Sequence, residues 1–374
     1  MIYLDNAATS LNKPNSVKIA ISRAVENLTA NPGRSGHGLS IKVADMVFET
    51  REKIKELFNA NGHNVIFTKN CSEALNIAIL GTLKNGDHVI TTCYEHNSVL
   101  RTLEYLKTKG VEVSVLNCDL WDFANLFETE IKPNTKMVIT NGVSNVTGEV
   151  CDVSKVGKIC KKHNLIYLVD GAQMCGHLEI DMLNSNIDIL TFAGHKGMLG
   201  ITGVGGLIVS NRIQLVPIMF GGTGTDSESL IQPTSIPEGY EIGTLSTIAI
   251  ASINAGVDFL KKNLENIQKN EEKLSKYTYF QLKKLKFIKI YSKQSVCNVV
   301  SFNIKNQDSM VVANELNDMG ICVRAGLHCA PLIHKKLGTT KQGAVRVSID
   351  FFNTKSEIDY LIFALQKINE KLSF

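Results

Sequence analysis

The stretch TFAGHKG, residues 191–197, follows an apolar run from Ile187 to Leu190 and precedes the glycine-rich stretch GITGVGG, residues 200–206. This order places Lys196 directly after a predicted buried strand. Burial disfavours the charged form of an amine, so a lysine at this position can lose its proton and form a Schiff base with an aldehyde. An ordinary lysine in an exposed loop would fit the same stretch, so Lys196 alone does not identify a site.

A carboxylate at the end of an earlier run supports the functional interpretation. The apolar run from Leu165 to Val169 ends in DGAQ, residues 170–173, and parallel sheets bind their ligands at the carboxyl ends of strands. An aspartate that pairs with a pyridine nitrogen keeps the ring protonated, as pyridoxal enzymes require. Asp170 alone could equally cap a helix, but Asp170 and Lys196 together indicate a cofactor site.

Between about residues 40 and 210, short apolar runs alternate with helical patterns. Several runs lack polar alternation, which is typical of strands that are buried on both faces and joined by helical crossovers. The pattern therefore predicts an α/β fold with a mostly parallel sheet. The predicted strands include residues 64–67, 89–91, 137–140, 165–169 and 206–209.

The last third of the chain has a different pattern. From Ile253, apolar residues recur every three to four positions, which predicts a long amphipathic helix that bridges two domains. Strand-like runs follow at 288–291 and 299–302, and a closing helix carries apolar residues from Ile358 to Ile368. We expect a large domain at 12–255 and a smaller α+β domain formed by 1–11 and 256–374.

The DGAQ and GHK segments together resemble the class V aminotransferase family of fold-type I pyridoxal enzymes, and in particular its group II cysteine desulfurases and selenocysteine lyases. The resemblance covers nearly the whole chain. It implies pyridoxal 5'-phosphate as the cofactor, bound by Lys196, and a large cofactor-binding domain with a small C-terminal domain.

Further segments carry the same resemblance, namely YLDNAAT at 3–9, NCSEA at 70–74, YEHN at 94–97, VSNVTG at 143–148 and EIGT at 241–244. The resemblance implies that His96 stacks on the pyridine ring and moves protons. It also implies that Thr244 reaches the phosphate across a dimer interface, so we expect a homodimer. The implied cofactor contacts are Lys196, Asp170, Gln173, His96, Cys71, Ser72, His195, Asn145 and Thr244.

An arginine in the segment AVRVS, residues 344–348, is the candidate for substrate recognition. Arg346 resembles the residue that holds the amino-acid carboxylate through a bidentate pair, although an arginine in a strand can also be an ordinary ion-pair partner. The resemblance implies substrate contacts by Arg346, Asn145, Ala8 and His37.

The segment CVRAGLHCAP, residues 322–331, resembles the cysteine loop that separates desulfurases from transaminases. It implies that Cys329 takes sulfur from L-cysteine, leaving alanine and a persulfide that passes to an acceptor protein. Thiolate is the reactive form of cysteine, and Arg324 and His328 are expected to favour it electrostatically.

Several positions depart from the family pattern. Ala193 stands where a phosphate-binding serine is usual, Cys71 and Ser72 replace threonines, Leu327 replaces a histidine, and Pro331 follows the cysteine early. Three alternatives therefore stay open. The first is a selenocysteine lyase or another cysteine or cystine C–S lyase, the second is a class V transaminase, and the third is a scaffold that has lost catalysis.

Composition narrows the class of protein. The 374 residues are 44% hydrophobic and 20% charged, with a net charge of +4 spread over both signs, so no nucleic-acid partner is expected. The absence of an 18-residue apolar run argues against a membrane span and, with no signal-like N-terminus, points to the cytosol. Nine cysteines without a CxxC pair suggest neither a disulfide framework nor a zinc site.

Overall fold

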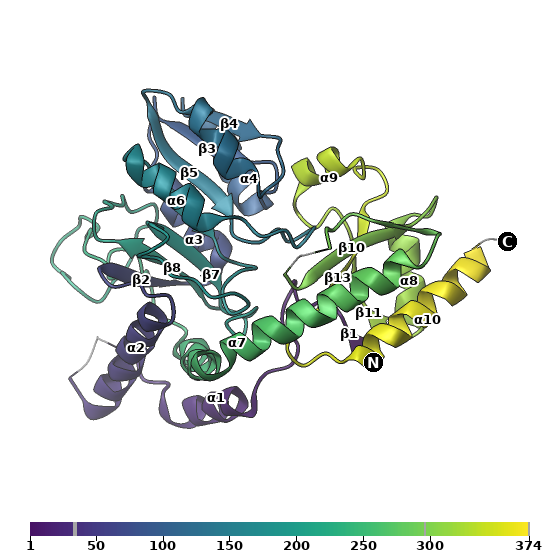
Figure 1. Ribbon diagram of the computed structural model, residues 1–374. Helices are drawn as coiled ribbons and strands as arrows, with labels where there is room; N and C mark the ends of the chain where they lie inside the picture. The colour runs from purple at the N-terminus through teal and green to yellow at the C-terminus, as the bar shows by residue number, and fades with distance from the viewer. Residues whose placement is uncertain (33–35, 295–296, 373–374) are drawn as a thin grey trace.

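A seven-stranded sheet forms the centre of the computed structural model, which describes residues 1–32, 36–294 and 297–372 (Figure 1). Its strand order is β2-β8-β7-β6-β5-β3-β4. Among the described strands of this sheet, β8 alone runs in the opposite direction and pairs antiparallel with β2 and β7, so the expected mostly parallel sheet is confirmed. The strands are β2 (His63–Thr68), β3 (His88–Thr92), β4 (Glu112–Leu116), β5 (Thr135–Asn141), β6 (Ile166–Asp170), β7 (Ile189–Ala193) and β8 (Gly205–Ser210).

Helices cover both faces of this sheet, which explains the continuous apolar runs. In β5, Val138 packs into one hydrophobic core while Met137 and Ile139 pack into the other. The first core includes side chains of α2, α6 and α7, and the second includes side chains of α3 and α4. The helical elements of this half are α1 (Asn15–Asn27), α2 (Gly38–Leu57), α3 (Cys71–Leu80), α4 (Asn97–Lys107), α5 (Phe123–Leu126), the 3-10 helix η1 (Phe127–Glu130), α6 (Val153–Lys162) and α7 (Thr247–Lys283).

The C-terminal part contains a four-stranded antiparallel sheet in the order β12-β13-β10-β9. The first strand of the chain, β1 (Ile2–Tyr3), pairs in parallel with β11 of this part. A third hydrophobic core lies here, under α8 and α10. The elements are β9 (Ile288–Ile290), β10 (Val299–Ile304), α8 (Ser309–Asp318), β11 (Ile321–Cys322), β12 (Arg324–Gly326), α9 (Pro331–Leu337), β13 (Ala344–Ser348) and α10 (Lys355–Leu372).

The long helix α7 extends from the part of the chain with the large sheet to the part with the small sheet, as Figure 1 shows. It contacts α1 and α2 on the side of the large sheet and β9, β10 and α10 on the other side. It begins at Thr247, six residues before the apolar periodicity that predicts it. The domain limits expected at 11/12 and 255/256 stay a prediction.

Across the three described ranges of the chain, no helix is both long enough and apolar enough to cross a membrane.

Candidate active site

Four neighbouring strands of the large sheet end at one cavity. The ends of β3, β5, β6 and β7 and the segments that follow them carry most of the expected site residues, because parallel strands present their carboxyl ends at the same edge, and the start of α3 adds Cys71 and Ser72. We call this space the Lys196 cavity. It is lined by Asn70, Cys71, Ser72, Leu75, His96, Ser98, Asn141, Val143, Asn145, Asp170, Ala172, Gln173, Ala193, His195 and Lys196.

Lys196 lies in a turn that the N-terminal segment holds in place. The carbonyl oxygen of His195 accepts hydrogen bonds from the Ser10 amide at 3.1 Å and from the Thr9 hydroxyl at 3.2 Å. Burial lowers the pKa of Lys196, while Cys71 and Asp170 raise it by a smaller amount. The amine is therefore closer to its neutral, nucleophilic form than a solvated lysine would be.

Asp170 ends β6 inside the cavity and is 5% exposed. Its Oδ1 accepts hydrogen bonds from the Ala172 amide at 3.0 Å and from the Cys71 thiol at 3.7 Å. Burial, followed by the charge of Asp170, raises the pKa of Cys71 well above its ordinary value. Cys71 is thus a neutral thiol that donates to the carboxylate.

The first turn of α3 offers a site for an anion. Asn70 caps this helix, since its side chain accepts a hydrogen bond from the Glu73 amide at 2.9 Å. Gly205 of β8 packs so closely here that a Cβ would lie 2.8 Å from the Cys71 nitrogen. A helix N-terminus of this kind attracts phosphate. The hydroxyl groups of Ser72 and Ser98, 2.6 Å apart, line the cavity beside this turn.

His96 caps α4 and lines the same cavity. Its Nδ1 accepts a hydrogen bond from the Ser98 amide at 3.1 Å, so the hydrogen of the neutral ring is on Nε2. Burial lowers the pKa of His96. Glu95, the preceding residue, is fully buried, and burial raises its pKa to about 8. At neutral pH this carboxyl group next to His96 is therefore mostly protonated and uncharged.

Unpaired polar atoms indicate that the cavity takes a polar ligand. Within the described residues, Asn141 Oδ1, Asn145 Oδ1, Gln173 Oε1 and His195 Nδ1 are buried without a hydrogen-bond partner, although their residues line the cavity. Buried polar groups are rarely left without partners. Together with the lysine, the aspartate and the helix N-terminus, they match a group that carries an aldehyde, a ring nitrogen and a phosphate.

Arg346 lies in β13 and is 1% exposed. Its Nη2 donates to Asp5 Oδ1 at 2.8 Å and its Nη1 donates to the Asn145 carbonyl at 3.1 Å, while Nε has no partner in the described structure. Sequence reasoning missed the role of Asp5. The signal was available, because a buried arginine requires a counter-charge and Asp5 lies in one of the matching segments.

We call residues 322–331 the cysteine loop. Cys329 alone is exposed among the nine cysteines, all of which the structure describes. The Arg324 Nη2 lies 3.9 Å from the sulfur of Cys329. The carbonyl oxygen of Cys329 accepts a hydrogen bond from the Asn97 amide at 2.7 Å. The loop therefore meets the chain directly after His96. Arg324 also contributes to the lowered pKa values of His96 and Lys196, which places its charge near both groups.

His328 does not behave as expected. The side chain of His328 is 3% exposed. Burial, followed by the charge of Arg346, lowers the pKa of His328 well below its ordinary value. The ring is therefore neutral and cannot favour a thiolate by its charge. The expectation that His328 helps Arg324 in this way is wrong.

Four of the expected contact residues are not part of the lining of the Lys196 cavity in the described structure, namely Arg346, whose bonds are given above, and three others. His37 is exposed and caps α2 through a bond from the Ser40 amide. Ala8 is half-buried and follows Ala7, whose carbonyl accepts from Gln173 Nε2 at 2.8 Å. Thr244 is exposed. The roles of these three residues stay predictions.

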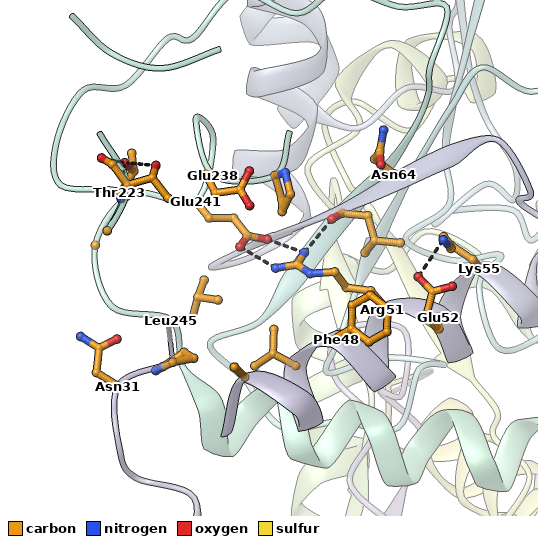
Figure 2. A pocket seen from close by; sticks show the side chains of 18 residues that line it. Asn31, Phe48, Arg51, Glu52, Lys55, Asn64, Thr223, Glu238, Glu241 and Leu245 are labelled. Carbon is orange, nitrogen blue, oxygen red and sulfur yellow. Dashed lines mark hydrogen bonds and ion pairs between the residues drawn. The ribbon is translucent and has the colours of Figure 1, made fainter. Parts of the chain in front are cut away.

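The segment that carries Thr244 is anchored by a partly buried ion pair. Arg51 donates to both carboxylate oxygens of Glu241, at 2.7 and 2.6 Å, and Glu241 also accepts from the Phe67 amide at 2.6 Å. Figure 2 shows this pair in a pocket between α2 and the segments around Thr223 and Leu245. The pair fixes the segment against β2 and leaves Thr244 facing outward.

Comparisons with known proteins agree with this geometry. The family model for aminotransferase class-V matches residues 2–361. A probable cysteine desulfurase of Methanothermobacter thermautotrophicus is 34% identical over 98% of this chain and 94% of its own length, and one of Pyrococcus abyssi is 34% identical over 100% and 95%. The apo cysteine desulfurase structure from Thermococcus onnurineus has a TM-score of 0.90 at 32% identity, covering 99% of this chain and 95% of that one. The chain belongs to the class-V aminotransferase family.

Proposed function

We propose that the protein is a pyridoxal 5'-phosphate-dependent cysteine desulfurase, which converts L-cysteine to L-alanine and carries the sulfur as a persulfide on Cys329. The observation that carries this proposal is that a loop of the C-terminal part, which carries an exposed cysteine, is hydrogen-bonded to a segment at the cavity of a buried lysine. A buried lysine of lowered pKa lines the Lys196 cavity. The one exposed cysteine lies on a loop that bonds to the segment beside His96.

The residues of the cavity fit the cofactor. Lys196 would bind its aldehyde, Asp170 its ring nitrogen, and the N-terminus of α3 with Ser72 and Ser98 its phosphate. When bound, the cofactor supplies an electron-withdrawing ring that stabilises negative charge on the α-carbon of an amino acid. His96, Gln173, His195 and Asn145 would surround it.

Side chains of the protein itself would accept the substrate's proton and bind its carboxylate. Burial lowers the pKa of Lys196, which favours the neutral form of its amine, and in that form the amine can accept the α-proton of the substrate. Arg346 bonds to Asp5 and Asn145, and its Nε has no partner among the described residues, so it can bind the substrate carboxylate.

Cys329, beside the Arg324 guanidinium, provides the sulfur nucleophile. In the net reaction the substrate C–S bond and one thiol S–H bond break, while an S–S bond forms on Cys329 and a C–H bond forms on the β-carbon. L-cysteine and the enzyme thiol thereby become L-alanine and the enzyme persulfide, with no external oxidant or reductant.

We infer that two copies associate through the segment around Thr244. Thr244 is exposed on a segment anchored by the Arg51–Glu241 pair, and Phe220 and Ile231 nearby in the chain are 76% and 81% exposed. Apolar side chains of this size, so exposed, are typical of a contact surface. Association would bring Thr244 of one copy to the phosphate of the other. The sulfur acceptor is proposed to be a separate protein that reaches the exposed Cys329.

The test compares wild type with Cys329→Ala. The variant should release no sulfide from L-cysteine in the presence of a reducing thiol, because no protein thiol can take the sulfur. Its visible cofactor absorbance should be unchanged, since Cys329 does not line the Lys196 cavity in the described structure. Cys322→Ala is the matched control, because this half-buried cysteine begins the same loop, and it should keep sulfide release.

Unchanged sulfide release by Cys329→Ala would refute the assignment of Cys329. Turnover of L-selenocysteine by the same variant, with none of L-cysteine, would be compatible with the desulfurase. A wild type that turns over selenocysteine but not cysteine would instead identify a selenocysteine lyase. A wild type without visible cofactor absorbance would support the non-catalytic scaffold.

A further inference from the structure

The backbone at the sulfur carrier adopts an unusual conformation. His328 and Cys329 have φ angles of +49° and +57°, so two consecutive residues with a Cβ lie in the left-handed region. Neither is glycine, and this region is unfavourable for such residues. Conformations of this kind persist only where surrounding contacts impose them. The bonds that impose this turn are therefore part of the machinery that places the Cys329 thiol.

Three hydrogen bonds to neighbouring elements hold the turn. The Asn97 amide donates to the Cys329 carbonyl at 2.7 Å, and His328 Nε2 lies 3.0 Å from the Ala344 carbonyl. The third is donated by Asn145 Nδ2 to the His328 carbonyl at 2.7 Å. Of these donors, Asn145 is the one whose side chain also lines the Lys196 cavity and is 7% exposed.

The chemistry of this bond fixes the orientation of the Asn145 amide. A carbonyl oxygen only accepts hydrogen bonds, so the NH2 group must face His328. That group has two hydrogens, and the second remains available to an acceptor in the cavity. The side-chain Oδ1 is buried and without a partner in the described structure. The backbone carbonyl of Asn145 accepts from Arg346 Nη1 at 3.1 Å.

We propose that Asn145 is a positioning residue for Cys329, in addition to its proposed contacts with cofactor and substrate. Its side chain fixes the left-handed turn that presents the thiol, and the same residue touches the cavity and the substrate-binding arginine. Asn145 thereby couples the contents of the Lys196 cavity to the placement of the sulfur carrier. The functional meaning of this coupling rests on the proposed role of Cys329, whereas the coupling itself does not.

Hydrogen exchange of the holoenzyme, measured by mass spectrometry, tests the coupling. Asn145→Asp keeps the size of the side chain but removes the donor, and Asn145→Ala removes the side chain. In both variants the amides of Ala330 and Asn97, which donate to Leu327 and Cys329 carbonyls, should exchange about two- to tenfold faster, the range expected for the loss of one hydrogen bond.

Asn141→Asp is the matched control. Asn141 lines the same cavity, and its Nδ2 donates at 2.8 Å to the Tyr94 carbonyl, outside the cysteine loop. Its Oδ1 is also unpaired in the described structure. This variant should leave exchange at Ala330 and Asn97 at the wild-type rate.

Unchanged exchange in both Asn145 variants would overturn the proposal, and so would equal acceleration in Asn141→Asp. If exchange accelerates as expected but Cys329→Ala still releases sulfide, the positioning stands and the proposed role of Cys329 fails. The two failures are therefore distinguishable.

Discussion

The Lys196 cavity and the cysteine loop differ in how the chain builds them. The cavity lies where β3, β5, β6 and β7 end side by side, so strand topology alone brings its residues together. The loop comes from the other sheet and owes its shape to a left-handed turn and to hydrogen bonds from Asn145 and Asn97. The geometry of a site at strand ends depends little on any single side chain, whereas the geometry of a loop held by a few hydrogen bonds depends on each of them.

Lys196→Ala should show the largest difference between the two regions, because it changes the cavity and leaves the residues of the cysteine loop in place. It should abolish the visible cofactor absorbance and lower sulfide release from L-cysteine by at least about 10²–10⁴-fold, the usual contribution of one acid–base group. The alkylation rate of Cys329 should change far less than sulfide release, because the bonds of the turn to Asn97 and Ala344 do not involve the cavity. Absorption spectra, sulfide assays and iodoacetamide labelling measure the three quantities. Surviving absorbance would refute the assignment of the lysine.

Arg346→Lys tests the residue that connects the two regions. A lysine keeps the charge but cannot bond to Asp5, Asn145 and a carboxylate together. Loss of one charge-assisted hydrogen bond, about 1.5–3 kcal/mol, should raise the KM for L-cysteine roughly 10- to 150-fold. The kcat should change by a smaller factor than the KM, and the cofactor absorbance should stay close to that of wild type. A kcat that falls as much as kcat/KM would place the arginine in the chemical step instead.

The sequence allowed the cavity to be predicted better than the loop. Apolar runs identified the strands, and the residues after them, including Asp170 and Lys196, line one cavity. The neutral state of His328 could not be foreseen, because it arises from burial and from Arg346, which is distant in the chain. The partnership of Asp5 with Arg346 likewise depends on β1 joining the C-terminal part. Such interactions between distant segments leave no local pattern.

Glu95→Gln tests the protonation state of the buried carboxyl group next to His96. The pKa of this carboxyl is raised from 4.5 to about 8, so the folded protein keeps a proton that the unfolded chain loses between these values. Stability from this group is complete below pH 4.5 and declines as pH rises toward 8, by up to about 1.4 kcal/mol per pH unit. Glutamine does not titrate, so its variant should gain on wild type over this interval. Chemical denaturation at pH 5, 6.5 and 8 measures the difference.

The pH dependence of the difference in stability between the variant and wild type shows whether Glu95 is protonated in the folded protein. Glu95 accepts hydrogen bonds from the Thr92 hydroxyl at 2.7 Å and the Asn141 amide at 3.0 Å, and the amide oxygen of glutamine can replace that acceptor. A variant whose stability relative to wild type is independent of pH would show that Glu95 is ionised in the folded protein.

Ala193→Ser should have the smallest effect and tests how far the cavity tolerates departures from the family pattern. Ala193 is 3% exposed and its side chain offers the cavity no hydrogen bond, while Ser72 and Ser98, which also line the cavity, have hydroxyl groups. If phosphate lies between them, a new hydroxyl adds one hydrogen bond of about 0.5–1.5 kcal/mol, and cofactor affinity should rise about two- to tenfold. Ala193→Val, which adds bulk without a donor, is the control and should weaken binding. If phosphate lies elsewhere, the serine hydroxyl is buried without a partner, so affinity would stay constant and the free energy of unfolding would fall by about 1–3 kcal/mol.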